Sequence, residues 1–419
     1  MVSSHSRRPV TLAVVVAALG YFVDIYDLIL FGTVRKASLQ ALGYVSPEAL
    51  AAKGVLLFNM QMGGMLVGGV LWGMLGDKRG RLSVLFGSII MYSIANIANA
   101  QVHSLEMYMV WRAIAGIGLA GELGAGITLV SELMDKEKRG IATAIVAGVG
   151  VIGGVAAGIV GGGIPWLWHG VDWRWAYRIG GIMGFALLLL RIGVTESGMF
   201  RTAAAASHVE RGNFFALFKT RERFLRYLAV ICVGVPVWYV VAILVTFSDR
   251  VGGAMHISPA PAPATCLMLC YAGLALGDVC SGMASQLLRS RRKAFGIFIT
   301  GVAIAVAALL GLGIAGALDT TTYYVMCVVL GIPTGYWAVF VTAAAEQFGT
   351  NLRATVATTS PNFVRGSAVL LTSGFLALTP ALGIVGAVAA TGAFSLGVAF
   401  LGLMKLRETF GVDLDYLEE

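Results

Sequence analysis

Six ionisable side chains interrupt long apolar segments of this sequence. They are Asp24, Asp27, Arg112, Glu122, Asp278 and Arg365. A charge near the centre of a lipid bilayer costs at least about 2.5–3.5 kcal/mol, so charged residues in such segments usually bind protons, ions or charged ligands. These residue types therefore indicate a protein that binds a charged molecule together with a proton or another ion.

The acids near the N-terminus are candidates for proton binding. Asp24 and Asp27 are three residues apart, so on a helix they share one face. Two carboxylates so close are not both ionised cheaply, and one of them tends to hold a proton. Glu122 follows Arg112 by ten residues, about 15 Å along a helix, and either binds a second proton or holds Arg112 in place. For Asp27 and Arg112, the alternative to proton binding is an ion pair that only ties two helices together.

Arg365 is the candidate for substrate binding. It lies about nine residues into an apolar segment, and a guanidinium group does not deprotonate in a protein, so it requires an anion. Arginine binds a carboxylate or phosphate in a planar, bidentate fashion. Asn362 falls on the same helical face. The alternative is a permanent ion pair between Arg365 and Asp278.

Other polar and aromatic side chains extend this candidate substrate site. They are Asn59 and Gln61, Trp238 and Tyr239 after Pro236, and Tyr336 and Trp337 after Pro333. Ordinary packing at proline kinks is the alternative for the aromatic pairs. The five histidines are far apart and no phosphate-binding glycine motif occurs, so we expect no metal, no cofactor and no enzyme activity.

The composition shows which elements must position these residues. Of the 419 residues, 58% are hydrophobic, 55 are glycine and only 12% are charged, with a mean hydropathy of +0.83. Because this small number of charges cannot cover a water-exposed surface, the sequence predicts an integral membrane protein. The five cysteines all lie in apolar stretches, which is typical of buried thiols.

Twelve apolar segments are long enough to cross a bilayer. They are 10–34, 54–76, 83–102, 107–131, 141–164, 176–194, 227–249, 264–288, 294–317, 322–345, 357–379 and 383–404. With the N-terminus in the cytoplasm, 22 basic residues fall on the cytoplasmic side and six on the other. This asymmetry predicts that both termini are cytoplasmic, and it accounts for the net charge of +8 without nucleic acid.

The two halves of the chain repeat. Glu132 and Arg139 are seven residues apart, as are Glu346 and Arg353, and the two pairs are offset by 214 residues. We therefore predict an all-α membrane protein of twelve transmembrane helices in two pseudo-symmetric six-helix bundles, as in transporters that alternate access. The expected parts are a bundle at 1–194, a cytoplasmic amphipathic linker at 195–226, a bundle at 227–404 and a cytoplasmic tail at 405–419.

The short cytoplasmic loops carry a second group of charges. They include Asp77, Arg81, Glu132, Arg139, Glu346 and Arg353. Ion pairs among them could latch the two bundles in one conformation. The alternative is that the basic members only follow the positive-inside rule, to which acids contribute little.

Several motifs resemble those of the major facilitator superfamily. Gly73-Met-Leu-Gly-Asp-Lys-Arg-Gly-Arg81 resembles its loop 2–3 signature, and Arg112-Ala-Ile-Ala-Gly-Ile-Gly118 is similar to its fourth-helix arginine motif. The loop motifs resemble the sugar-porter and metabolite:proton-symporter branches. The resemblance implies that Asp27 binds the transported proton while Arg112 tunes it, although Asp24 could fill that place.

The function expected from these observations is proton-coupled symport of a small organic anion, carboxylate-like, by a monomer in the bacterial inner membrane. The partners would be the substrate, protons and the bilayer. On the same fold, the alternatives are an exporter of a metabolite, metal chelate or drug, and a neutral sugar or polyol porter. A sensor is disfavoured because the tail after Lys405 is short.

Overall fold

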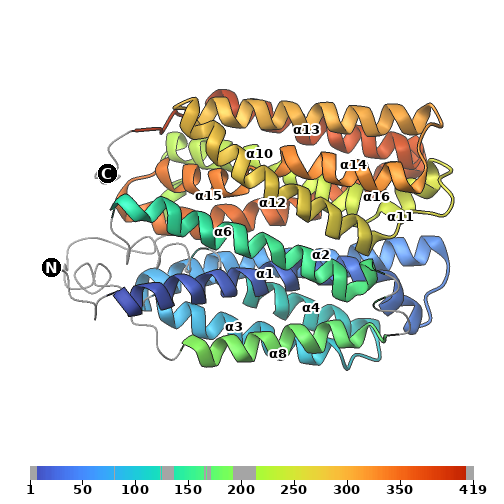
Figure 1. Ribbon diagram of the computed structural model, residues 1–419, viewed down its shortest axis with the longest axis horizontal. Coiled ribbons are helices and arrows are strands. Elements are labelled where there is room, and N and C mark those ends of the chain that lie inside the picture. Colours follow the sequence, from blue (N-terminus) through green and yellow to red (C-terminus); the bar gives the residue numbers. More distant parts are fainter. Residues whose placement is uncertain are drawn as a thin grey trace.

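The computed structural model describes residues 7–79, 81–122, 124, 136–164, 167, 171–191 and 214–411, with no placement given for some of their side chains. Within these ranges the structure is helical and contains no strand. Long helices run side by side along the longest axis, and the first and last described segments of the chain begin and end at the same end, on the left of Figure 1. We call this the terminal end.

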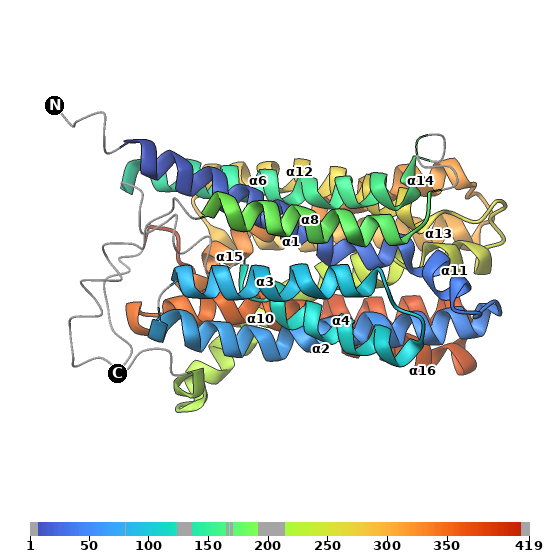
Figure 2. The same cartoon turned by 90° about the horizontal axis from the view of Figure 1, so that it is seen from below.

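The first half of the chain supplies the lower layer in Figure 1. Its helices are α1 (Arg7–Ala41), α2 (Pro47–Arg79), α3 (Arg81–Asn99), α4 (Leu105–Leu119), α6 (Lys136–Gly158) and α8 (Arg174–Leu190), and α6 continues as the π-helix η1 (Ile159–Gly163). Within this half α1 packs on α6, α2 on α4 and α3 on α8. Figure 2 shows several of these helices from below.

The second half begins with the 3-10 helix η3 (Phe214–Phe218). Its further helices are α10 (Arg221–Tyr239), which continues as the π-helix η4 (Val240–Val245), α11 (Ser248–Ala254), α12 (Pro263–Leu287), α13 (Arg291–Ile314), α14 (Thr320–Thr334), α15 (Trp337–Glu346) and α16 (Thr350–Lys405). Here α10 packs on α16 and α12 on α14.

Every predicted membrane segment overlaps a described helix. Among the described residues, seven helical stretches are long and apolar enough to cross a bilayer on their own, and α3 and the end of α6 with η1 form shorter apolar helices. The stretch Thr355–Lys405 has 51 residues, about 76 Å of helix, which is enough for two crossings. Gly383, with φ of 68°, breaks it at the first residue of the predicted twelfth segment.

Local sequence signals set where several helices start. Ser104, Thr220, Ser290 and Asp319 precede α4, α10, α13 and α14, and each side chain accepts a hydrogen bond from a backbone N–H of the first turn. Such caps contribute about 1 kcal/mol each.

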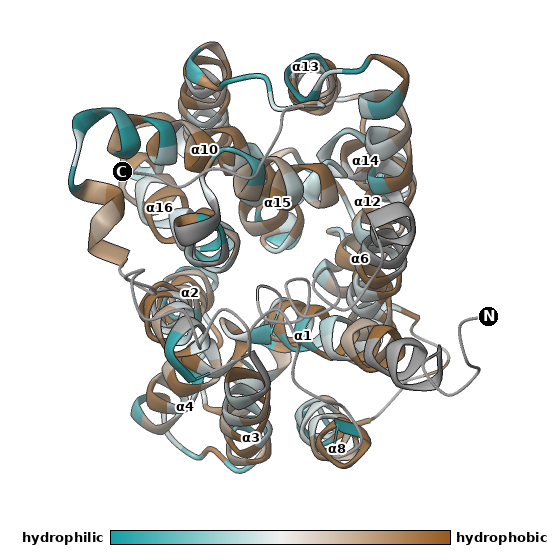
Figure 3. Ribbon diagram, turned by 90° about the vertical axis from the view of Figure 1, so that its left-hand side faces the viewer, coloured by the Kyte–Doolittle hydropathy of each residue, from teal (hydrophilic) through white to brown (hydrophobic). Residues whose placement is uncertain are grey.

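The two halves meet along two helix pairs, α2 with α16 and α6 with α12. Figure 3, which looks along the helices, places both pairs between the halves. Glycines in α6 permit this approach, because a Cβ atom at Gly154 would collide with the ring of Tyr271 and one at Gly158 with Met268. Large apolar side chains such as Ile304, Leu370 and Leu401 lie exposed on outer faces, as a lipid-facing surface requires.

Candidate functional site

Arg365 and Asp24 form a buried ion pair that joins the two halves. Nη2 of Arg365, on α16, lies 3.1 Å from Oδ2 of Asp24, on α1. The side chains are 1% and 0% exposed. The pair with Asp278 that the sequence left open is not formed in this structure. A pair this deep between two bundles is costly to desolvate, so it is weak evidence for stability and stronger evidence for a functional role.

The Arg365 guanidinium has further hydrogen-bonding capacity. Its Nε and Nη1 atoms are buried and have no hydrogen-bond partner among the described residues, and the same holds for Oδ1 of Asp24. The ring of Trp337 lies 5.8 Å from the guanidinium carbon, within range of a cation–π contact. Buried unpaired donors are unusual in a folded protein. Their arrangement offers a site for an anion attached to a flat apolar group.

Asp27 and Arg112 are both buried but do not contact each other directly. Arg112 donates hydrogen bonds to Oε1 of Gln61 and, at 3.5 Å, to the hydroxyl of Tyr177. Gln61 in turn donates to the backbone carbonyl of Asp27 at 3.4 Å. The Asp27 carboxylate has no hydrogen-bond partner within the described ranges, and it lies against Gly180 of α8. The proton-coupling role of this group stays a prediction.

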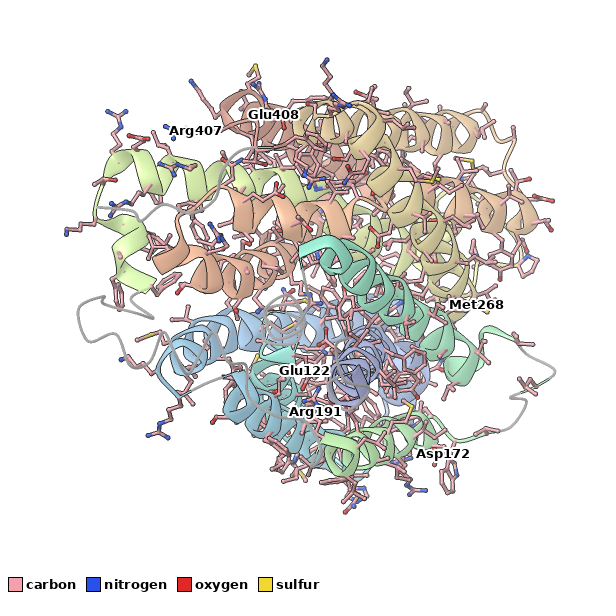
Figure 4. All side chains as sticks on the ribbon, turned by 60° about the vertical axis from the view of Figure 1, so that its left-hand side comes forward. Glu122, Asp172, Arg191, Met268, Arg407 and Glu408 are labelled. Atoms are coloured by element: carbon pink, nitrogen blue, oxygen red, sulfur yellow. The ribbon has the colours of Figure 1, made fainter. Side chains whose placement is uncertain are left out.

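Glu122 pairs with Arg191 instead of supporting Arg112. The two side chains form two hydrogen bonds of 2.6 and 2.9 Å, and both are 1% exposed. Ser88 donates a third bond to Glu122, and Arg191 also donates to the carbonyl of Leu85. Figure 4 labels both residues inside the first half. This fork-to-fork geometry indicates a structural tie between the ends of α4 and α8.

The predicted amide donors connect the halves. Asn59 of α2 donates to Ser373 at 3.1 Å and accepts from Thr372 at 2.7 Å, both on α16. Asn362 of α16 donates to the carbonyl of Ala120 at 2.9 Å. These hydrogen bonds hold α16 beside the first half and fix the direction in which Arg365 points.

The four predicted aromatic residues divide into two kinds. Tyr239 and Tyr336 are buried inside the second half, where their hydroxyls donate to backbone carbonyls at 3.0 and 2.9 Å. Trp238 instead packs its ring 6.5 Å from that of Phe58 in the first half, and its Nε1 atom has no partner among the described residues. Of these four residues, Trp238 and Trp337 are therefore the ones that lie at the interface between the halves.

Asp278 caps a broken helix. The tenth predicted segment is split, because α14 ends at Thr334 and α15 begins at Trp337. Asp278 of α12 accepts a hydrogen bond of 3.0 Å from the backbone N–H of Ala338, in the first turn of α15. A carboxylate at a helix N-terminus offsets the unpaired backbone donors there. This bond positions Trp337 next to Arg365.

The predicted latch is only partly covered by the structure. Glu132 and the side chains of Asp77, Arg81 and Arg139 lie outside what the structure describes. Glu346 forms an ion pair with Arg291 at 3.0 Å and accepts from Thr409 at 2.7 Å, and Arg353 also has a partner. The contacts of Glu346 lie within the second half at the terminal end, and a latch between the bundles stays a prediction.

A connection that sequence reasoning missed lies at the opposite end. Arg35 of α1 forms a 2.7 Å ion pair with Asp249 of α11, and its guanidinium lies 4.4 Å from the centre of the Phe247 ring. Arg35 is only 2% exposed. Arg35 directly follows the segment predicted at 10–34 and Asp249 ends the segment predicted at 227–249, and charged residues at segment ends usually face water. The pair ties the two halves together at the end away from the termini.

We expect Asp249→Asn to loosen that end. The change leaves the buried Arg35 without its counter-ion, so the closed arrangement loses stability relative to one in which the halves separate there. Hydrogen exchange measured by mass spectrometry should speed up in segments 33–42 and 246–254. Asp172→Asn, which alters an exposed acid of the first half, is the matched control. Unchanged exchange in both variants would show that the pair does not close this end.

The fold and the buried charges together indicate a class of membrane protein. Two bundles of membrane-spanning helices that meet through polar residues at mid-depth are the architecture of a secondary transporter. Residues 10–370 match the family model of the Major Facilitator Superfamily, so the chain belongs to that superfamily.

Curated relatives carry transporter names. A Haemophilus influenzae protein whose description names metabolite transport is 30% identical over 188 residues, which are 45% of this chain and 44% of that protein. This chain thus matches less than half of that relative's length. A Cupriavidus pinatubonensis protein, described as a probable 4-methylmuconolactone transporter, is 24% identical over 96% of this chain and 91% of its own. The gentisate transporter of Corynebacterium glutamicum is 25% identical over 79% and 73%.

The fold is also that of a solved transporter. The structure of the proton:xylose symporter XylE bound to 6-bromo-6-deoxy-D-glucose superposes with a TM-score of 0.74 over 97% of both chains, at 14% identity. This likeness supports the fold of twelve helices in two bundles. Because the chain belongs to the Major Facilitator Superfamily, the protein is a multi-pass membrane transporter and not an enzyme.

Proposed function

We propose that this protein is a proton-coupled symporter for a small organic anion, in particular a carboxylate attached to a flat, unsaturated ring. The observation that carries the proposal is Arg365, a permanent cation buried between the halves with two unpaired donors beside Trp337. A carboxylate would accept from Nη2 together with one of these two donors in a planar pair, and a ring would pack on the tryptophan. Asn362, Asn59 and Trp238 would form the walls.

The named relatives support this substrate class. Gentisate is an aromatic carboxylate and 4-methylmuconolactone is a small ring compound, and the proteins carrying these names match most of this chain. A neutral sugar offers no anion to the two Arg365 donors that Asp24 leaves unpaired. One of the buried acids Asp24 and Asp27 would carry the transported proton, with Arg112 and Glu122 holding their surroundings in place.

We further propose that bundles 1–194 and 227–404 rock about this site, with 195–226 as a linker and both termini and the tail 405–419 in the cytoplasm of a bacterial cell. The Arg35–Asp249 pair would then close the outer end. Of the proposed latch residues Asp77, Arg81, Glu132, Arg139, Glu346 and Arg353, the last two belong to the second half. The transporter would work as a monomer.

A binding screen on purified protein tests the substrate class. The carboxylate panel consists of benzoate, 4-hydroxybenzoate, nicotinate and gentisate, and its matched neutral compounds are benzamide, nicotinamide and xylose. We expect at least one carboxylate to raise the thermal stability in a concentration-dependent way, because a ligand that binds only the folded state stabilises it. Stabilisation by xylose or the amides, with none by the carboxylates, would refute the organic-anion proposal.

A further inference from the structure

The Asp24–Arg365 pair has the chemistry of a site already filled by an internal anion. Asp24 is itself a carboxylate, and it engages Arg365 through a single hydrogen bond from Nη2, while Nε and Nη1 have no partner in the described part of the chain. A free carboxylate could bond to two of the three guanidinium nitrogens. Asp24 therefore accepts fewer hydrogen bonds from Arg365 than a bound carboxylate ligand would.

The charges around Asp24 make this pair a balanced unit. Arg365 is the cation that contacts Asp24. Two other acids repel a negative charge on Asp24: Asp27 on the same helix and Glu122 just after α4. The charge of Glu122 is neutralised by its ion pair with Arg191. The titratable tyrosines near Asp24 are Tyr21 on α1, Tyr92 on α3 and Tyr271 on α12. Asp278 of α12 is close enough to Tyr21 to interact with it electrostatically. Within this set, the anion on Arg365 is Asp24.

We propose that ionised Asp24 occupies the substrate's place on Arg365, so that a substrate carboxylate binds only when Asp24 takes up a proton. The inference rests on the proposed function and identifies Asp24, not Asp27, as the residue that couples the proton to the substrate. The proton adds to the Asp24 carboxylate, which becomes neutral and releases Arg365. The substrate carboxylate then accepts the hydrogen bonds of Arg365. No covalent bond other than that O–H bond forms or breaks.

The exchange keeps the net charge of the site constant. Empty, the site contains Arg365 as a cation and Asp24 as an anion; loaded, it contains Arg365, the substrate anion and neutral Asp24. A site with only the proton or only the substrate would bury an unpaired charge, which is strongly unfavourable. The halves can therefore change conformation empty or fully loaded, and each monocarboxylate moves with one proton and no net charge.

The pH dependence of binding tests this exchange. For the carboxylate panel, the Kd of the unmodified protein should rise by up to about tenfold per pH unit between pH 6 and 8, because binding requires one added proton. In Asp24→Asn no anion competes for Arg365, so the Kd should be low and constant over that range. Asp27→Asn should keep the unmodified slope.

Calorimetry provides a measurement that needs no variant and so does not depend on Asp24→Asn folding. Titrations at pH 7.5 in buffers of different ionisation enthalpy should show uptake of close to one proton per carboxylate bound. Binding without proton uptake, or a steep slope retained in Asp24→Asn, would overturn the exchange while leaving the substrate class intact. Failure of the whole panel to bind both proteins at every pH would instead refute the proposed function, and the exchange with it.

Discussion

Arg365→Ala is expected to abolish measurable binding of the carboxylate panel, and Arg365→Lys to weaken it about 5- to 150-fold. Lysine keeps the charge but not the planar fork, and a charged hydrogen bond contributes about 1–3 kcal/mol. Alanine removes both the charge and every donor. Equilibrium binding of a radiolabelled panel member to purified protein measures the effect, and Arg292→Ala, at an exposed arginine, is the control.

Size-exclusion profiles of these variants separate lost binding from lost folding. In Arg365→Ala the Asp24 carboxylate is left buried without a cation, so the double variant with Asp24→Asn restores the charge balance. This double variant should fold but still fail to bind. If it bound the carboxylates as tightly as the unmodified protein, Arg365 would be only a tether between α16 and α1.

Breaking the Glu122–Arg191 pair is expected to produce the largest loss of stability. Arg191→Ala leaves Glu122 charged and buried, and removing one partner of a buried pair typically costs about 3–5 kcal/mol. Glu122→Gln should also destabilise the protein, and the double variant Glu122→Gln/Arg191→Met should recover part of the loss, because it buries no unpaired charge. Thermal unfolding in detergent, monitored by circular dichroism, gives the order of stability.

The exposed pair of Asp172 and Arg174 supplies the matched control. It is separated by 3.5 Å and is half exposed at the acid, so Asp172→Asn should change the stability by no more than about 1 kcal/mol. Single variants at Glu122 and Arg191 that melt like this control would contradict a structural role. The pair would then be a candidate for a second proton site.

Periodicity and charge were sufficient to predict the helices, because a span needs a long apolar run whatever its neighbours are. They also singled out Arg365 and Asp24, since a charge at that depth is rare. The partner of Arg365 could not be predicted, because it lies 341 residues away on a helix of the other half. Spacing along one helix carries no information about which face of another helix it meets.

Residues at segment ends were misjudged for a related reason. Arg191 and Arg35 follow apolar runs, where a basic residue usually reaches water, yet both are buried against acids from other helices. The break before Trp337 was suggested by Pro333, but its cap by Asp278 depends on how α12 packs beside α15. The sequence pattern does not predict such contacts between distant segments.

Uptake into proteoliposomes tests the central claim most directly. With the membrane potential clamped at zero and an inward gradient of one pH unit, the protein should accumulate a panel carboxylate about tenfold, since one proton moving down that gradient releases about 1.4 kcal/mol. A protonophore should abolish the accumulation. Carboxylate uptake that only equilibrates across the membrane under the same gradient, or accumulation of xylose in its place, would contradict proton-coupled transport of an organic anion.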